Sequence, residues 1–416
     1  MSKLLIKGGK TLNGSVRVQG AKNSVLPILA ATVLCDDIST IHGCPQLRDV
    51  SAAVKILECL GCRVKREGDT LTVDAKCVSA ADLPDSLMRR MRSSITFLGA
   101  ITARCGRAKM CSPGGCEIGI RPIDLHIKAL RELGIRVYET GGYTETEADR
   151  IKGADIHLDF PSVGATENIM LASCLGDGKT TIWNAAKEPE ISDLQDFLCK
   201  MGAKIKGAGS DVIVIDGVKK LHGAEHRVIP DRIVAATYLC TGAMCGGEIN
   251  LTNICSTHIK SVISVLKDTG MIIKEEKDGI TLKSNGRILP IDILRTMPYP
   301  GFPTDAQAPF AALLSLAEGT SVIVENIFEN RFKYCGELCR MGADIKVSGR
   351  AAVIRGVKRF YGACVTAMDL RGGAALVAAG AAAHGETQID GVNLIERGYE
   401  SIEDDLAKLG ADIKKD

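Results

Sequence analysis

Apolar and polar residues recur along the chain in one repeated arrangement. An amphipathic helix end is followed by a glycine and then by a short strand with alternating apolar positions. The six segments that show it read LECLGCRVK, LRELGIRVY, LCKMGAKIK, VLKDTGMIIK, LCRMGADIK and LAKLGADIK, with glycines at Gly61, Gly134, Gly202, Gly270, Gly342 and Gly410. Each glycine stands where a helix C-cap belongs, because glycine enters the left-handed region at low cost. The spacing predicts a unit of roughly 70 residues that is repeated six times along the whole chain.

A β-hairpin is predicted after each of these glycines. The third repeat continues at 211–228 and the fifth at 351–369, both with the spacing I-x-G-x-K-x-(L/F)-x-G. The sixth repeat stops at Asp416 without such a segment, whereas 4–18 has the same spacing. We therefore expect the N-terminal strands to complete the last repeat.

This arrangement predicts two domains joined by two chain crossings. One domain is continuous, at 22–229, and the other is discontinuous, at 1–21 plus 230–416. Two crossings make a hinge, which suits an enzyme that closes over its substrate.

Two predicted helices, at 165–175 and 231–244, are apolar on nearly every side. A helix that is apolar all round is buried. The predicted fold class is therefore α/β, as a two-lobed inside-out barrel with helices inside each lobe and sheets outside.

Charged residues recur at one place in the repeats, after the predicted hairpin and before the buried helix. Lys22, the turn at 162–167, Asp231, Asp305 and the pair Asp369 and Arg371 all occupy it. Equivalent turns of a repeated lobe cluster at one end. We expect two lobes that face each other by these ends to form one charged cleft.

Composition excludes several classes of protein. The 416 residues carry a formal net charge of +2 and 4% aromatic residues, which argues against a nucleic-acid or membrane surface. The N-terminus has no signal peptide pattern and no stretch is long enough to span a membrane. The 16 cysteines are scattered, and Cys59 and Cys62 have C-x-x-C spacing without a second half or a nearby His. We expect reduced thiols, no metal and a cytoplasmic location.

Three positions stand out as candidates for chemistry, each with a simpler alternative. Lys22 and Asn23 begin a helix, where a cation strengthens an anion site, but Lys22 is equally well read as a solvated lysine. Cys116 follows Pro-Gly-Gly in a loop that presents a thiol, although such loops are often plain turns. Asp305 in FPTDAQA fits a helix N-cap, which on the local sequence alone is the better interpretation.

Several motifs in order along the chain carry a family resemblance. They are GAKN at 20–23, SPGGCEIGIRPIDLH at 112–126, VGATENIM at 163–170, FPTDAQA at 302–308, FENRF at 328–332 and ERGYESIEDDL at 396–406. With the six repeats, they resemble the UDP-N-acetylglucosamine 1-carboxyvinyltransferases of the enolpyruvyl transferase family. The resemblance covers the full chain.

The resemblance implies transfer of the enolpyruvyl group of phosphoenolpyruvate to the 3-hydroxyl of UDP-N-acetylglucosamine, the first committed step of peptidoglycan synthesis. It implies no cofactor and no metal. Cys116 would be the general acid on a lid loop and the target of fosfomycin, and Asp305 the base. Lys22 and Arg397 would bind phosphoenolpyruvate, with Asn23 in contact with the substrates.

The remaining site residues also come from the resemblance. The substrate-binding set would include Arg92, Arg121, Pro122, Ile123, Asp124, Leu125, Ser162, Val163, Ile327, Arg331, Asp369 and Arg371. The Gly-Gly-Ala-Ala after Arg371 departs from the family pattern and is expected to loosen the helix start. Phe160-Pro161 stands near the place of a lysine that contacts the nucleotide in some members. Asp231 is expected to be structural.

Two alternatives remain at this point. The enolpyruvyl transferase of the shikimate pathway has the same fold and donor, but it lacks a catalytic cysteine in a PGGC loop. A six-repeat ring that binds DNA is a non-enzymatic alternative, which the small net charge disfavours.

Overall fold

The computed structural model describes residues 2–79, 81–88, 92–111 and 123–416. They form two compact units. Unit 1 comprises 2–19 and 230–416, and unit 2 comprises the described residues between 20 and 229. That these units are two domains joined by a hinge stays a prediction. None of the described helices has the length and apolar character that crossing a lipid bilayer requires.

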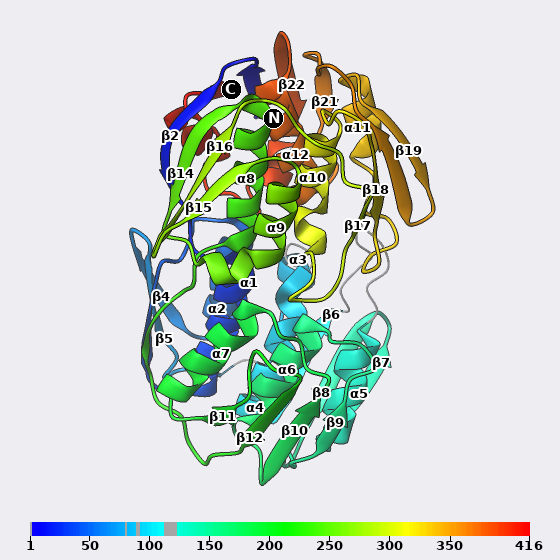
Figure 1. The fold of residues 1–416 in the computed structure, drawn as a ribbon. Coiled ribbons are helices and arrows are strands. Elements are labelled where there is room, and N and C mark those ends of the chain that lie inside the picture. The colour runs from blue at the N-terminus through cyan, green and yellow to red at the C-terminus, as the bar shows by residue number, and fades with distance from the viewer. Residues whose placement is uncertain (1, 80, 89–91, 112–122) are drawn as a thin grey trace. The chain divides into compact units, whose positions relative to one another are not determined.

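Unit 1 contains three four-stranded sheets within its described residues (Figure 1). Their orders are β21-β22-β1-β23, β15-β16-β14-β2 and β17-β18-β20-β19. The strands are β1 (Leu4–Lys7), β2 (Leu12–Arg17), β14 (Gly247–Thr252), β15 (Ile272–Glu275), β16 (Gly279–Ser284), β17 (Ile293–Arg295), β18 (Thr320–Val324), β19 (Asp344–Ser348), β20 (Ala351–Arg355), β21 (Cys364–Thr366), β22 (Glu386–Asp390) and β23 (Asp412–Lys415). The helices are α8 (Arg232–Cys245), η3 (Ser256–Ile259), α9 (Lys260–Asp268), η4 (Thr304–Ala306), α10 (Gln307–Leu314), α11 (Cys335–Arg340), α12 (Leu370–Ala382), α13 (Val392–Ile395) and α14 (Ile402–Lys408).

Unit 2 has two four-stranded sheets and one three-stranded sheet in its described part. Their orders are β13-β3-β5-β4, β11-β12-β10-β9 and β6-β8-β7. The strands are β3 (Ile38–His42), β4 (Arg63–Glu67), β5 (Thr70–Asp74), β6 (Arg107–Cys111), β7 (Arg136–Thr140), β8 (Tyr143–Glu147), β9 (Asp155–His157), β10 (Lys179–Trp183), β11 (Lys204–Lys206), β12 (Val212–Asp216) and β13 (Glu225–Arg227). The helices are α1 (Lys22–Ala31), η1 (Thr32–Leu34), α2 (Arg48–Cys59), α3 (Asp85–Met88), η2 (Arg92–Thr96), α4 (Phe97–Cys105), α5 (Asp124–Glu132), α6 (Val163–Ser173) and α7 (Pro189–Lys200).

Each unit has some helices that are buried and others that lie on its surface. In unit 1, α8, α10 and α12 are buried along almost their whole length and pack against one another. In unit 2, α4 contacts both α1 and α6, and all three are mostly buried. Helices such as α2, α5 and α9 are amphipathic and keep one polar face exposed. The buried helices predicted at 165–175 and 231–244 correspond to α6 and α8. The fold is thus mixed α/β.

Five of the sheets share one pairing pattern, which consists of a parallel pair at one edge followed by two antiparallel pairs. In β17-β18-β20-β19, for example, β17 and β18 are parallel, and β18, β20 and β19 form an antiparallel meander. The sheet β6-β8-β7 has only the antiparallel pairs, and an isolated parallel bridge between Asp82 and Lys109 stands where the others have their parallel strand.

The predicted C-cap glycines are confirmed. Gly61, Gly134, Gly202, Gly270, Gly342 and Gly410 all have positive φ, between 79° and 99°. An antiparallel hairpin follows the first five of them, as β4–β5, β7–β8, β11–β12, β15–β16 and β19–β20.

The segments at 211–228, 351–369 and 4–18 are not hairpins, which corrects the prediction for them. Their two strands enter different sheets: β12 and β13, β20 and β21, and β1 and β2 do not pair with each other. The glycines in these segments mark a close approach of two backbones, because a Cβ at Gly217 would lie 1.8 Å from the carbonyl oxygen of Gly176. Gly356 lies equally tightly against Ala317. The motif therefore carries the chain from one sheet to the next.

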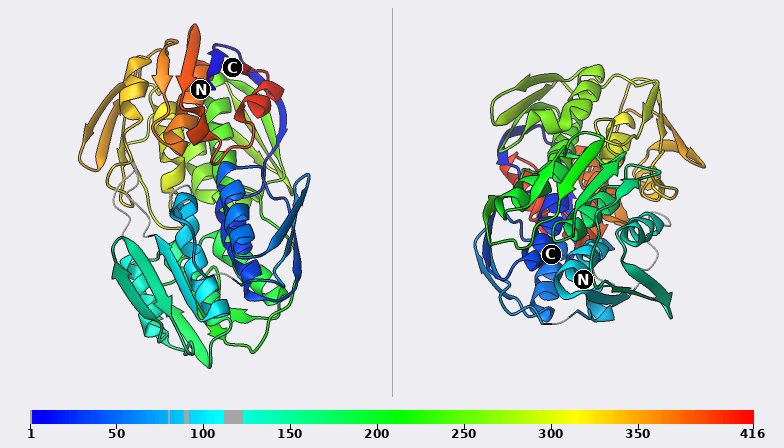
Figure 2. Two further views of the ribbon diagram at one scale, coloured as in Figure 1. Left: turned by 180° about the vertical axis from the view of Figure 1, so that it is seen from behind. Right: turned by 90° about the horizontal axis from the view of Figure 1, so that it is seen from below.

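The N-terminal strands complete two sheets of unit 1 instead of one. Strand β1 lies between β22 and β23, whereas β2 pairs in parallel with β14. Lys3 and Asp416 exchange two backbone hydrogen bonds, so both ends of the chain lie side by side (Figure 2). The expectation that the N-terminal strands complete the last repeat is correct for β1 and wrong for β2.

The close approach at Gly356 makes a stability prediction. We expect Gly356→Ala to lower the free energy of unfolding by about 3 kcal/mol or more, because its Cβ would stand 1.6 Å from the Ala317 carbonyl oxygen. Gly336 in α11 is the matched control, since nothing lies within 4 Å of a Cβ there. Gly336→Ala should be neutral or stabilising by up to about 1 kcal/mol, as alanine is the better helix residue. Urea unfolding of both variants measures the difference, and equal effects would contradict this account of the motif.

Candidate functional site

Asp305 is the centre of a charged cluster in unit 1. Residue Asp305 lies in η4, between Pro303 and the start of α10. Arg331 donates to its Oδ1 at 2.5 Å and Arg371 donates to its Oδ2 at 3.3 Å. Both guanidinium side chains are 4% exposed, whereas the carboxylate is 26% exposed. The structure thus brings three of the predicted site residues together around one partly open carboxylate.

The N-cap interpretation of Asp305 is wrong. The N-caps of η4 and α10 are Pro303 and Ala306, and neither helix has a side-chain hydrogen bond at its cap. The two oxygens of Asp305 bind arginines instead. An acid at this place in the sequence suits a cap, but the sequence does not show that two distant arginines fold against it.

Arg371 is held on several sides. Burial disfavours its charged form, but Asp305, Tyr399 and Asp231 together outweigh this and raise the pKa of Arg371 above its ordinary value. Its Nη1 donates to the Tyr399 hydroxyl at 3.3 Å, and that hydroxyl lies 2.7 Å from Thr237 Oγ1. Among the described residues its Nε has no hydrogen-bond partner. Arg331 and Arg371 thus share the Asp305 carboxylate, and the buried Asp231 also acts on Arg371.

Asp369 and Asp231 both cap buried helices. Asp369 Oδ1 accepts the backbone N–H groups of Arg371 and Gly372, each at 2.9 Å, and so caps the start of α12. That the glycines after Arg371 loosen this helix start stays a prediction. Asp231 Oδ1 accepts from Ile233 and from Val234 and caps α8, which confirms its structural role. The cap of Asp369 fixes the backbone that carries Arg371.

Arg397 and Ile327 complete the predicted residues of unit 1. Arg397 is partly buried just after α13. The Ile327 N–H donates to Glu325 Oε1 at 2.8 Å. A backbone contact from Ile327 to a substrate would therefore use its carbonyl group.

Lys22 begins α1 in unit 2 and is not a solvated lysine. Its side chain is 11% exposed, and Nζ lies 2.7 Å from the buried carboxylate of Asp49, which begins α2 with Arg48. No side chain caps α1 at Ala21. Asn23 is partly buried beside it. The surface alternative for Lys22 is thereby excluded, and a buried cation stands at a helix N-terminus, where anions bind favourably.

A buried network holds the first turn of α1. Ser24 Oγ donates to Asp193 on α7, and the same carboxylate accepts from the His226 ring at 2.8 Å. Lys200 Nζ lies 3.2 Å from the other ring nitrogen of His226. Because an ammonium only donates, that nitrogen accepts and the nitrogen facing Asp193 carries the proton. The network ties α1, α7 and β13 together two residues after Lys22.

The predicted nucleotide residues of unit 2 lie at the starts of α5 and α6, which contact each other. Ile123 precedes α5, which begins with Asp124 and Leu125. Ser162 caps α6 by accepting from the Ala165 N–H at 3.3 Å, and Val163 is the first residue of α6. Arg92 begins η2. Cys116, Arg121 and Pro122 lie outside the described residues.

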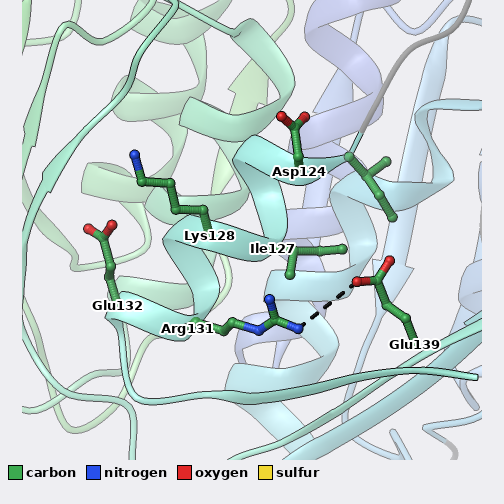
Figure 3. A pocket seen from close by; sticks show the side chains of 7 residues that line it. Asp124, Ile127, Lys128, Arg131, Glu132 and Glu139 are labelled. Carbon is green, nitrogen blue, oxygen red and sulfur yellow. Dashed lines mark ion pairs between the residues drawn. The ribbon is translucent and has the colours of Figure 1, made fainter.

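A hollow of about 730 Å³ runs along the outer face of α5 (Figure 3). Its lining combines Ile123 and residues along the whole of α5 with one residue of β7, namely Ile123, Asp124, Ile127, Lys128, Arg131, Glu132 and Glu139. Arg131 faces Glu139 across it at 4.0 Å. Of the predicted residues that the structure describes, only Ile123 and Asp124 line this hollow, so it does not by itself define the nucleotide site.

Three further buried polar residues of unit 2, Glu167, His126 and Asn168, were not predicted. Burial raises the pKa of Glu167 on α6 well above its ordinary value, and Glu190 adds to the effect. Burial lowers the pKa of His126 on α5 to about 4, so the ring is neutral and hydrogen-bonds Asn168 at 2.9 Å. Glu167 and Asn168 interrupt an otherwise apolar segment, and that signal could have identified them. In the described part of the chain, no group of His, Cys, Asp and Glu is arranged to hold a metal ion.

Comparison with known proteins agrees with this architecture. Residues 6–406 match the family model described as EPSP synthase (3-phosphoshikimate 1-carboxyvinyltransferase). A UDP-N-acetylglucosamine 1-carboxyvinyltransferase 2 of Caldanaerobacter subterraneus subsp. tengcongensis is 56% identical over 99% of both chains. A UDP-N-acetylglucosamine 1-carboxyvinyltransferase of Halothermothrix orenii is 49% identical over 100% of both.

A solved structure is similar over the whole chain as well. The enolpyruvyl transferase NikO from Streptomyces tendae superposes with a TM-score of 0.90 at 26% sequence identity, covering 100% of this chain and 98% of that one. The chain therefore belongs to the EPSP synthase family of enolpyruvyl transferases.

Proposed function

We propose that this protein transfers the enolpyruvyl group of phosphoenolpyruvate to the 3-hydroxyl of UDP-N-acetylglucosamine and releases phosphate. Full-length relatives that carry the name of this activity support it over the shikimate-pathway reaction. The observation that carries it in the structure is Asp305, a partly exposed carboxylate whose two oxygens are held by the buried Arg331 and Arg371. Membership of an enzyme family leaves the non-enzymatic ring without support.

Asp305 is the proposed acceptor of the proton from the sugar hydroxyl. Two guanidinium groups favour its ionised form, which is the form that can take a proton. They also fix both carboxylate oxygens, and a correctly placed base needs this orientation. An anionic substrate that draws on the same arginines weakens their hold on Asp305 and makes it a better base at the moment of reaction.

The reaction then balances as an addition followed by an elimination. The deprotonated sugar oxygen bonds to C2 of phosphoenolpyruvate while C3 gains a proton from Cys116. In the second step C3 loses a proton and the bond from C2 to the phosphate oxygen breaks. The role of Cys116, with those of Arg121, Pro122 and Arg92, rests on the family resemblance.

Lys22 supplies a cation for the anionic donor in this proposal. Asp49 already lies at its Nζ, so the pair is neutral before substrate binds. An ammonium has three donors, and one of them suffices for a phosphate oxygen. Lys22 with Asn23 and Arg397 would bind phosphoenolpyruvate. The starts of α5 and α6, with Asp124, Leu125, Ser162 and Val163, would bind the nucleotide, where helix N-termini favour phosphate.

We also infer that each unit is an inside-out barrel of three repeats. The shared pairing pattern of the sheets and the buried helices of both units support this inference. The substrates are small molecules, and the pathway that uses them places the enzyme in the cytoplasm.

One assay tests the proposed function. Phosphate release from phosphoenolpyruvate should depend on UDP-N-acetylglucosamine, and shikimate 3-phosphate should not replace it. Release with shikimate 3-phosphate alone would assign the protein to the other reaction of its family. Release with neither acceptor would contradict both.

Asp305→Asn should reduce kcat by about 10²–10⁴-fold, the usual range for general acid–base help. The affinity for phosphoenolpyruvate should stay the same or increase, because Arg331 and Arg371 lose the carboxylate that pairs with them. Calorimetry and steady-state kinetics separate these two effects. The control is Asp344→Asn, which removes an exposed ion pair with Arg355 on a neighbouring hairpin and should change neither. A kcat within a few-fold of wild type would exclude Asp305 as the base.

Fosfomycin should modify Cys116 and no other cysteine. The phosphonate of the epoxide binds the cations that hold phosphoenolpyruvate, and the Cys116 thiolate opens the ring by forming a C–S bond. The exposed thiols of Cys59, Cys77 and Cys199 are internal controls that should stay unmodified. Cys116→Asp should retain some activity, since a carboxylic acid can donate a proton, and should resist inactivation. Peptide mass mapping decides, and an adduct elsewhere would overturn the assignment.

A further inference from the structure

Glu325 is a carboxylate buried completely within unit 1, directly after strand β18. Its Oε1 accepts from Thr296 Oγ1 at 2.9 Å and from the N–H groups of Ile327 and Phe328 at 2.8 and 3.0 Å. Its Oε2 accepts from Thr304 Oγ1 at 2.9 Å. Complete burial of an acid is costly unless donors surround it, and here four neutral donors do so.

Three of these donors belong to two segments that both carry proposed site residues, and the fourth, Thr296, directly follows β17. Thr304 directly precedes Asp305 in η4, and Ile327 is itself a proposed substrate contact. A single carboxylate joins these two segments. Its Oε2 accepts from the side chain of Thr304, and its Oε1 accepts from the main chain of Ile327. A shift of Glu325 would therefore move both segments.

A second connection leads from Glu325 to Asp305. The Phe328 N–H is fixed by Glu325, and the Phe328 ring centroid lies 5.4 Å from the guanidinium carbon of Arg331. Arg331 in turn donates to Asp305. A cation over an aromatic face is attracted to it, so the ring restrains the arginine that orients the base. The contacts form a closed circuit through Thr304, Glu325, Phe328, Arg331 and Asp305.

We propose that Glu325 is a positioning residue for the reaction, which sets the place of Asp305 through Thr304 and the place of Ile327 through the turn at 325–328. The inference rests on the proposed function. Glu325 has no exposed surface and touches no substrate. It acts by holding two segments in one geometry, and small displacements of a catalytic group have large effects on rate.

Thr304→Val tests the connection to Asp305. The change removes the hydroxyl that binds Oε2 and keeps the shape of the side chain. We expect kcat to fall about tenfold or more while KM for both substrates changes little, because the base is displaced and the binding residues are not. Thr269→Val is the control, since Thr269 is a buried threonine at the end of α9 whose hydroxyl bonds a backbone carbonyl. It should leave kcat unchanged.

A double variant separates positioning from a general structural role. In an Asp305→Asn background, Thr304→Val should cost no further activity, because it acts only through the residue already lost. If the two losses multiply in the double variant, the proposal is overturned. The same holds if the wild-type protein is active and Thr304→Val has the same kcat.

Two substitutions of Glu325 itself should have different effects on kcat. Glu325→Gln should retain most activity, because its amide oxygen still accepts from Ile327 and Phe328 and its NH₂ can donate to Thr304. Glu325→Asp is one methylene shorter and cannot reach both segments, so kcat should fall about 10–100-fold. Equal kcat in these two variants would contradict the proposal.

Hydrogen exchange gives a readout that does not depend on the reaction. Peptides that cover 302–308 and 325–331 should exchange about tenfold faster or more in Glu325→Asp than in wild type, and no faster in Thr269→Val. Unchanged exchange in both peptides would overturn the proposal even if the wild type is active. A wild type without enolpyruvyl transfer, together with faster exchange, would instead refute the proposed function and keep Glu325 as the residue that holds the two segments.

Discussion

Helices α8, α10 and α12 have almost no side that faces water, so the polar groups that they carry depend on partners inside unit 1. Gln307 Nε2 and Arg371 Nε are the exceptions, since neither has a hydrogen-bond partner among the described residues. Their hydroxyl side chains bond carbonyl groups of their own helix, as Thr241 does at 2.8 Å and Ser315 at 2.8 Å. Charged groups are accommodated only at the helix ends, where the first N–H groups need acceptors. The burial of whole helices thus confines the charged residues of these three helices to their N-terminal ends.

The charged groups at these ends neutralise one another only in part. Lys22 forms an ion pair with one buried carboxylate, whereas the Asp305 carboxylate forms ion pairs with two buried arginines. A buried charge without a partner costs several kcal/mol, so these pairings stabilise unit 2 at Lys22 and unit 1 at Asp305. A substrate anion that bound here would draw on the same two arginines as Asp305. Stability of the free protein and affinity for anions therefore depend on the same side chains.

Local patterns in the sequence were enough to predict the repeated elements, but they did not predict the contacts between those elements. The C-cap glycines and the hairpins that follow them were predictable, because left-handed backbone and alternating apolar residues leave local traces. The segments around Gly217 and Gly356 were misread as hairpins, since a glycine required by a neighbouring backbone looks the same as a glycine required by a turn. The same distinction applies to the candidate site, where single residues were predictable and their contacts were not. Asp305 and Arg371 were predicted, but their pairing, and the buried Glu325 that accepts from Thr304, depend on residues far apart in the chain.

Strand β1 lies between β22 and β23, so one of the first strands to leave the ribosome can pair only with two of the last. At roughly 5–20 residues per second, synthesis leaves this strand without its partners for tens of seconds. During that time its apolar Leu4 and Ile6, which are fully buried in the finished protein, remain available to chaperones or to other nascent chains. Unit 2, whose sequence is complete at Ile229, has no such wait. The order of translation thus makes unit 1 the slower half to mature, and quality control in the cell would act on its N-terminal strand.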